Sequence, residues 1–433
     1  MSFIVLTANA QCTFERYYKF YAPTNWNTKT IHTSDGGFLT VGSMYVDSLN
    51  PGQNGYPYMC AVKNDSCGNI LWKNIYGPSE NGDVVEADNG DYLMTNTGPG
   101  PAIANIEVVR IDKNGQLLWD KIYTGNIQSF AYHIIKRKNK NSYIVSGSNV
   151  YGYAMEINDT GNVLRGYSYV YGGLTKVLET TDSTYLMVGG THDTLFLIQT
   201  DTSFNVKGVK KIFFNFITPY IIFYDACISS DNKSIVMTLC VGGNLMVKVA
   251  LDGSFITYKT LAKSFPDPIC IIPTPDNGYL VGSALLYTDS NFNITKYQNV
   301  SNTILGSFVL NQNQSVTASG INVRSGQYYE LCVLRINTNG SYAHSGINEA
   351  KTATTNWIIY PNPAANELHI ETTGSEKFGV QLFDITGKKV MENILFTNTT
   401  TINTSSLNEG MYFVRITDVN GAIIKTQKVT VMR

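Results

Sequence analysis

The sequence predicts an all-β protein: a seven-bladed β-propeller followed by a small immunoglobulin-like β-sandwich. A repeat of about 46 residues recurs seven times between Phe14 and Tyr342, which is the spacing of propeller blades with four strands each. A spare strand precedes the first copy, and short alternating strands follow Trp357. These three observations predict the fold class.

The repeat contains two recurring phrases. The first is a polar turn, an aromatic residue and an apolar strand that ends in Gly or Ser, as in DGGFLTVGS. The second is a strand, a turn bearing Gly or Asn, and another strand, as in IEVVRIDKNGQLLWDKIYTG. Asn-Gly and Asp-Gly turns accept positive φ and close tight hairpins, so each copy forms an antiparallel sheet. Copies of the first phrase begin at Asp35, Asn89, Asn139, Asp182, Asp231, Asp276 and Asn311.

The two ends of the repeat region complement each other. The last copy has no strand of the LWxKxYG type after Asn339-Gly340, whereas Glu15 to Tyr21, ERYYKFY, resembles that strand and lacks a copy of its own. We therefore expect the N-terminal strand to complete the final blade. Such closure removes the exposed edges that an open array of sheets would present.

The C-terminal stretch, from Trp357 to Arg433, reads as a separate sandwich. Short alternating apolar runs, such as Gly379 to Phe383 and Met411 to Ile416, are separated by turn signals such as Asn420-Gly421. Alternation buries one face of each strand and leaves the other in water. About seven short strands in fewer than ~100 residues suit an immunoglobulin-like sandwich.

This stretch also resembles a known family. YPNP from Tyr360, LFDITGKKV from Leu382 and LNEGMYFVRI from Leu407 occur in the order and spacing of the type A sorting domain of the type IX secretion system. The resemblance implies export of a folded protein through the outer membrane, with the secretion machinery and its sortase-like peptidase as partners. A plain adhesive sandwich is the alternative. The residues matched to the sorting motif are Tyr360, Pro361, Asn362, Pro363, Asp384, Gly387, Gly410 and Tyr412.

The predicted domain bounds follow from these observations. Residues 1–10 are the remainder of a signal peptide, because Ala8-Asn9-Ala10 forms a cleavage site that leaves Gln11 first. Residues 11–342 form the propeller, 343–356 a polar linker, and 357–433 the sorting domain. Cys12 raises a lipoprotein alternative, but Gln11 stands where a lipidation motif requires a small residue. We expect a secreted or outer-membrane surface protein that travels through the periplasm.

Composition excludes several partners. The net charge is −1 and only 15% of residues are charged, so no strong field attracts nucleic acid. No stretch approaches the ~20 apolar residues of a membrane span. The seven cysteines show no metal-binding spacing, and Cys60–Cys67 and Cys227–Cys240 are as consistent with hairpin disulfides as with free thiols. We expect no metal and no cofactor.

No catalytic constellation stands out. His32 and His133 fall at comparable places in their repeats and read as packed side chains. Turns such as DKNG at Asp112 lack most of the roughly six oxygens of a calcium site. Carboxylates that could meet in a channel lie near strand ends at Asp83, Glu86, Asp182 and Asp231.

The candidate ligand-binding features are irregular insertions between strands, at residues 44–58, 96–105 and 212–224. Exposed aromatic side chains there would stack on sugar rings or partner surfaces. The expected contacts are Tyr45, Tyr56, Tyr58, Phe216 and Tyr220. A non-enzymatic glycan- or protein-binding module is thus the first hypothesis. A polysaccharide hydrolase or lyase and a purely structural adhesin are the alternatives.

Overall fold

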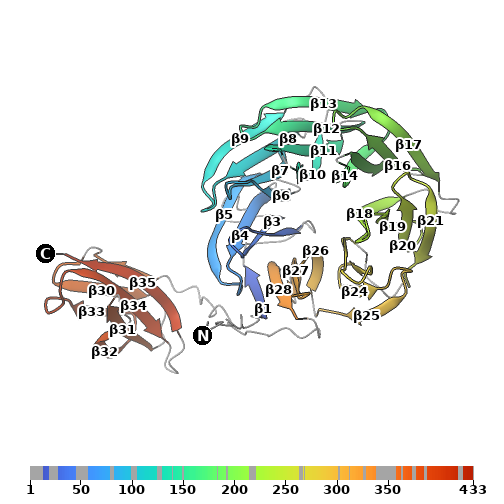
Figure 1. Ribbon diagram of the computed structural model, residues 1–433. Helices are drawn as coiled ribbons and strands as arrows, with labels where there is room; N and C mark the ends of the chain where they lie inside the picture. Colours follow the sequence, from blue (N-terminus) through green and yellow to red (C-terminus); the bar gives the residue numbers. More distant parts are fainter. Residues whose placement is uncertain are drawn as a thin grey trace, which may run out of the picture. The chain divides into compact units, whose positions relative to one another are not determined.

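A computed structural model gives the fold as two compact units, residues 1–345 and 346–433 (Figure 1). The structure describes residues 13–18, 28–44, 57–78, 82–98, 105–123, 129–138, 140–148, 151–182, 184–191, 194–213, 221–262, 267, 269–300, 303–311, 313–324, 328–337, 357–361, 364–372, 377–384, 388–417 and 423–432. This described part contains strands and no helix, and therefore no helix that could cross a membrane.

The first unit consists of seven four-stranded antiparallel sheets arranged as the blades of a propeller, as the repeat predicts (Figure 1). Blade 1 contains β2 (Thr28–His32), β3 (Phe38–Met44), β4 (Tyr58–Asn64) and β5 (Ile70–Pro78). Blade 2 contains β6 (Gly82–Glu86), β7 (Tyr92–Gly98), β8 (Asn105–Ile111) and β9 (Leu117–Tyr123). Blade 3 contains β10 (Phe130–Lys136), β11 (Ser142–Ser148), β12 (Gly152–Asn158) and β13 (Val163–Tyr169).

Blades 4 to 7 continue the same order. Blade 4 contains β14 (Gly173–Glu179), β15 (Tyr185–Gly190), β16 (Thr194–Thr200) and β17 (Val206–Phe213), and blade 5 contains β18 (Ile222–Ile228), β19 (Ser234–Cys240), β20 (Asn244–Ala250) and β21 (Phe255–Thr260). Blade 6 contains β22 (Ile271–Pro273), β23 (Tyr279–Val281), β24 (Leu285–Thr288) and β25 (Ile294–Gln298). Blade 7 contains β26 (Thr303–Leu310), β27 (Val316–Arg324) and β28 (Tyr328–Ile336), together with β1 (Phe14–Tyr18).

The N-terminal strand closes the propeller. β1 pairs antiparallel with β28, with Phe14 opposite Arg335 and Tyr18 opposite Leu331. The prediction that the spare N-terminal strand completes the final blade is therefore confirmed. The first strand of each blade contacts the first strand of the next, and β26 contacts β2, so the inner strands form a closed ring around a central channel. Buried apolar side chains fill the interfaces between neighbouring blades.

The outer strands hold neighbouring blades together through their aromatic residues. Trp72 of β5 donates from Nε1 to the Lys113 carbonyl (2.9 Å), and the Tyr76 hydroxyl donates to the Gly115 carbonyl (2.9 Å), in the turn between β8 and β9. Trp119 and Tyr123 of β9 repeat these contacts on Asp159 and Gly161 of blade 3. The strand aromatics thus serve inter-blade packing.

The described residues of the second unit form a seven-stranded sandwich. One sheet holds β29 (Trp357–Tyr360), β30 (Glu367–Thr372) and β33 (Thr399–Asn403). The other holds β32 (Lys389–Phe396), β31 (Phe378–Asp384), β34 (Gly410–Thr417) and β35 (Ile423–Val431). Leu368 and Ile402 of the first sheet share a core with Val414 of the second. The apolar side of the alternating sequence pattern therefore faces the core between the two sheets, as predicted.

Neither hairpin disulfide allowed by the sequence is formed. Cys60, Cys227 and Cys240 are free thiols, whereas Cys67 is disulfide-bonded. Cys60 and Cys67 do not pair with each other because Cys60 lies opposite Ile75 in the ladder, whereas Cys67 lies beyond the end of β4. Cys227 lies opposite Val236 while Cys240 lies opposite Ile222, at the other end of the same pair of strands. Cys12 lies outside the described residues.

Substitution of Gly115 should destabilise the contact between blades 1 and 2. Gly115 has a φ of +80°, which residues other than glycine rarely adopt, and an added Cβ would lie 2.8 Å from the Trp72 ring. We expect Gly115→Ala to lower the free energy of unfolding by about 2 kcal/mol, measured by urea denaturation. Gly208→Ala is the matched control, because no heavy atom lies within 4 Å of its added Cβ. Equal stability of the two variants would contradict this account of the turn.

Candidate functional site

The channel is lined by seven equivalent side chains, one from each blade. Each lies four residues before the residue that opens the first hairpin turn of its blade, such as Thr33 in blade 1 and Thr180 in blade 4. We call this set the channel belt. Its members in blade order are Lys29, Asp83, His133, Lys176, Asp225, Cys270 and Ser307.

All seven members of the belt line one cavity of about 870 Å³. This volume falls within the range of ligand pockets, roughly 300–1,000 Å³. The two lysines and two aspartates of the belt balance in charge. The cavity therefore presents a mixture of hydrogen-bond donors and acceptors around a site with little net charge.

The belt also connects the blades. Asp83 accepts a hydrogen bond from the Ile134 amide of the next blade (3.0 Å), and Asp225 accepts one from the Ile271 amide (3.1 Å). His133 and Ser307 accept equivalent bonds from Val177 (3.4 Å) and Thr30 (3.1 Å). In each case the donor directly follows the belt residue of the next blade. These side chains thus position neighbouring inner strands as well as lining the channel.

Lys176 and Asp225 form the strongest ion pair of the belt. The Lys176 Nζ lies 2.7 Å from Asp225 Oδ1, and both side chains are largely buried. Burial raises the pKa of the Asp225 carboxyl, but Lys176 and then Lys29 outweigh that effect and hold the pKa below its usual value. Burial lowers the pKa of Lys176, but Asp225 and then Asp83 leave it raised. Both groups are therefore charged at neutral pH.

His133 is neutral in this environment. Burial, then the charges of Lys176 and Lys29, lower its pKa well below the usual value. Its Nδ1 accepts the Val177 N–H, which places the ring proton on Nε2. That atom faces Asp83 Oδ2 at 3.4 Å. His133 is thus a neutral ring beside Asp83, and it adds no charge to the belt.

β-Bulges add a second side chain beside several belt residues. The pairing register skips Tyr132 in β10 and Tyr224 in β18, directly before His133 and Asp225. In a regular strand successive side chains point to opposite faces, whereas a bulge re-aims one of them. Both tyrosines therefore line the cavity together with the belt. Phe223 and Phe308 add further aromatic surface to the same cavity.

Few of the contacts expected from the sequence can be placed. Tyr58 is half-buried at the start of β4, while Tyr45, Tyr56, Phe216 and Tyr220 lie outside the described residues. Their role in binding stays a prediction. The described strand ends that flank the three candidate insertions lie at one edge of the propeller, because the second strands end and the first strands begin there. Tyr132 and Tyr224 lie near that same edge.

The carboxylates singled out from the sequence do not converge. Asp83 belongs to the belt, but Glu86 accepts hydrogen bonds from Ser34 at the end of β6. Asp182 and Asp231 cap the first hairpin turns of their blades, accepting from Thr184 and Lys233. Sequence reasoning missed Lys29, Lys176 and Asp225. Counting back from each turn to the same position of every first strand would have found them.

The two histidines compared in the sequence are not equivalent. His133 is a belt residue, whereas His32 directly precedes its turn and packs against Phe38 in a tilted arrangement, with ring centroids 4.9 Å apart. Within the residues that the structure describes, no group of three or more His, Cys, Asp or Glu side chains could hold a metal ion. The Asp112 turn is closed by its own carboxylate, which accepts from the Asn114 and Gln116 amides at 2.8 Å each.

One further acidic group lies outside the channel. Burial, then the neighbouring Asp120 carboxyl, raise the pKa of Glu107 to about 8. Glu107 lies on β8, the third strand of its blade, and accepts a hydrogen bond from Asn96. It does not line the channel cavity. The carboxyl with the raised pKa is thus separated from the aspartates of the belt.

The residues of the sorting motif lie at strand ends in the sandwich. Tyr360 ends β29 and precedes a cis peptide bond to Pro361, while Asp384 ends β31 and accepts from the Lys388 amide at 3.0 Å. Gly410 begins β34 with a φ of +151°. Tyr412 is buried, and its hydroxyl donates to the Asn408 carbonyl at 2.8 Å. Asn362, Pro363 and Gly387 lie outside the described residues.

With the two folds established, comparison with known proteins assigns the second unit. Residues 358–432 match the family model described as the secretion system C-terminal sorting domain. The resemblance seen in the sequence is therefore confirmed. The chain carries a sorting domain of the type IX secretion system, which directs it through the periplasm to the cell surface or the extracellular space and implies contact with that machinery.

The chain is also similar, at low sequence identity, to several solved structures. A protein of unknown function from Bacteroides caccae has 12% identity and a TM-score of 0.41, covering 61% of this chain and 94% of that one. Sqt1 from Chaetomium thermophilum has 12% identity, a TM-score of 0.45 and coverages of 78% and 86%. The WD40 β-propeller domain of Doa1 has 10% identity, a TM-score of 0.48 and coverages of 76% and 100%. No curated protein matches the chain.

Breaking the ion pair of the belt should be costly. Lys176→Met leaves a largely buried carboxylate without its partner, so we expect a loss of roughly 3 kcal/mol in the free energy of unfolding. The double variant Lys176→Met/Asp225→Asn should lose less than the sum of the two single variants. Lys136→Met is the control, because its partner Asp88 is 68% exposed and the pair should contribute under about 1 kcal/mol. Additive losses in the double variant would argue against a buried pair.

Removal of residues 357–433 should abolish export. In a host with a type IX system, we expect the truncated chain to accumulate in the periplasm while the full chain reaches the surface or the medium. Cell fractionation and immunoblotting measure this distribution. Lys259→Met, on the outer strand β21, is the control and should be exported normally. Unchanged export of the truncated chain would show that the sandwich is not the sorting signal.

Proposed function

We propose that this chain is an exported, non-enzymatic binding protein whose propeller recognises a glycan at its channel. The sorting domain supplies delivery, and the propeller supplies recognition after delivery. The surface-anchored and released forms are both compatible with this role, as is removal of the sandwich by a sortase-like peptidase. The C-terminal unit thus serves export, and the propeller serves binding.

One observation carries the proposal: both aspartates of the channel belt are engaged in contacts that hold the fold. Asp83 accepts from the Ile134 amide and faces His133, while Asp225 accepts from the Ile271 amide and pairs with Lys176. A glycoside hydrolase needs one carboxylic acid with a raised pKa opposite a free carboxylate. The pKa of Asp225 is instead lowered. This arrangement favours binding over hydrolysis.

The cavity has the chemistry of a saccharide site. Tyr132 is 36% exposed and lies beside the mixed donors and acceptors of the belt. Aromatic faces pack against the apolar faces of sugar rings, and uncharged hydroxyl groups require both donors and acceptors. Hydrogen bonds to the next blade account for four of the polar belt residues. A purely structural adhesin offers no such reason for the partly exposed ammonium of Lys29.

A glycan array probed with the full chain tests this function. We expect binding to a subset of immobilised glycans, with Tyr132→Ala reducing the signal at least fivefold. Tyr258→Ala is the matched control, because Tyr258 is exposed on the outer strand β21 and should leave binding unchanged. No binding to any glycan would contradict the proposal. Time-dependent release of reducing ends from a bound glycan would replace it with the hydrolase alternative.

A further inference from the structure

Lys29 differs from the other charged members of the channel belt. Its Nζ lies 4.0 Å from Asp83 Oδ1, beyond hydrogen-bond distance, whereas Lys176 Nζ lies 2.7 Å from its partner. The Lys29 side chain is 34% exposed, compared with 13% for Lys176. The Lys29 ammonium is thus held loosely by the protein and is accessible from the cavity.

The belt is asymmetric around Lys29. The two blades that precede blade 1 around the ring contribute Cys270 and Ser307, which carry no charge. Burial raises the pKa of Cys270 well above its usual value, so it remains a thiol. Ser307 Oγ accepts the Thr30 amide at 3.1 Å, which leaves its own proton to donate. This arc of the belt therefore offers an ammonium and a hydroxyl donor, and the nearest belt carboxylate is Asp83 of the adjoining blade, 4.0 Å from the ammonium.

The opposite arc contains the paired charges. Asp83, His133, Lys176 and Asp225 are joined to one another or to backbone amides of the next blade. Tyr132 and Tyr224 flank this arc from the bulges of β10 and β18. Burial raises the pKa of both phenols, so both stay neutral. The second arc can thus meet the face and the hydroxyl groups of a sugar ring.

From this division we propose that the cavity binds a hexuronic acid residue of an acidic glycan. The carboxylate of the sugar pairs with Lys29 and accepts from Ser307, while the ring packs against the tyrosine side of the belt. This inference rests on the proposed glycan-binding function and specifies its ligand. A charge-assisted hydrogen bond contributes about 1.5–3 kcal/mol, which corresponds to a preference of at least tenfold for acid over neutral ester.

Isothermal titration of the full chain with trigalacturonic acid and with its methyl ester tests this assignment. We expect the acid to bind at least tenfold more tightly, and this preference to weaken as salt is added. Lys29→Met should reduce the affinity for the acid to that for the ester, and Lys29→Arg should keep the preference. Tyr132→Ala should weaken both ligands in similar proportion.

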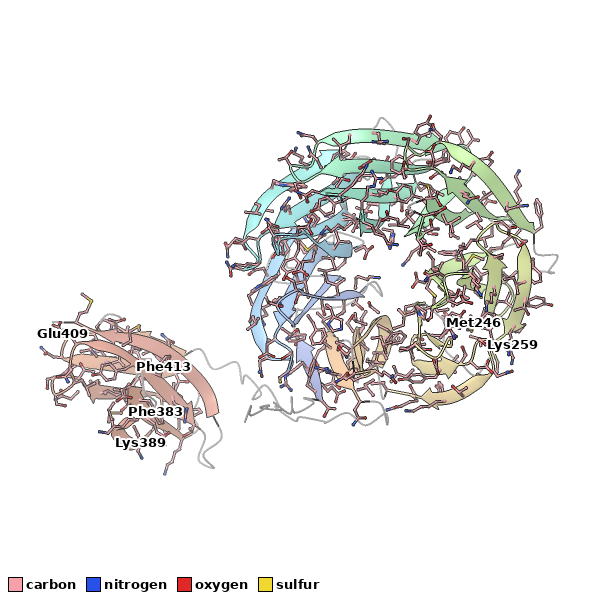
Figure 2. The ribbon with its side chains drawn as sticks, viewed as in Figure 1. Met246, Lys259, Phe383, Lys389, Glu409 and Phe413 are labelled. Carbon is pink, nitrogen blue, oxygen red and sulfur yellow. The ribbon has the colours of Figure 1, made fainter. Side chains whose placement is uncertain are left out.

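Lys259→Met is the matched control, because Lys259 lies on the outer edge of the propeller, where Figure 2 labels it. It should leave both affinities unchanged. Thermal unfolding of each variant verifies that it folds.

Equal affinity for acid and ester, or a preference that survives in Lys29→Met, would overturn the inference. Tight binding of hexaglutamate with no binding of the uronate would also overturn it, in favour of an acidic peptide. If the glycan array is positive only for neutral sugars, this inference fails and the proposed function stands. If the array is empty, both fail.

Discussion

The pairing of β1 with β28 is the constraint on which the propeller depends. Each blade buries its faces only against its two neighbours, so the array is complete only when blade 7 contacts blade 1. The N-terminal strand supplies the outer strand of blade 7, with Tyr17 opposite Cys332. Phe14 of that strand packs on blade 1, because a Cβ at Gly68 would lie 2.5 Å from its ring. Both chain ends of the ring are thus fixed at one seam.

Closure also creates the channel belt. Seven first strands meet around one axis only in a closed ring, and equivalent positions then face one another across the channel. The same side chains accept amides from the next blade, as Asp83 does from Ile134. Residues that shape the cavity are therefore residues that hold neighbouring blades in register. This double use explains why polar side chains persist where a packed apolar core would otherwise form.

The sequence predicted the fold far better than the site. Turn glycines such as Gly115 and the LWxKxYG strands recur visibly, because every blade needs the same turn and the same inter-blade contact. The belt positions vary in residue type, from Lys29 to Ser307, so no recurring letter marks them. His133 and Asp83 drew notice singly, but Lys176 and Asp225 did not. Their meeting depends on ring geometry that no local pattern contains.

Hydrogen–deuterium exchange of the full chain, followed by mass spectrometry, tests the closure of the ring most directly. If β1 completes blade 7, the amides of Phe14–Tyr18 that face β28 should be protected, as those of Leu331–Arg335 are, because the two segments share one ladder. Both should lose protection together as denaturant is added. Rapid exchange across Phe14–Tyr18 with Leu331–Arg335 still protected would show that the N-terminal strand does not close the propeller.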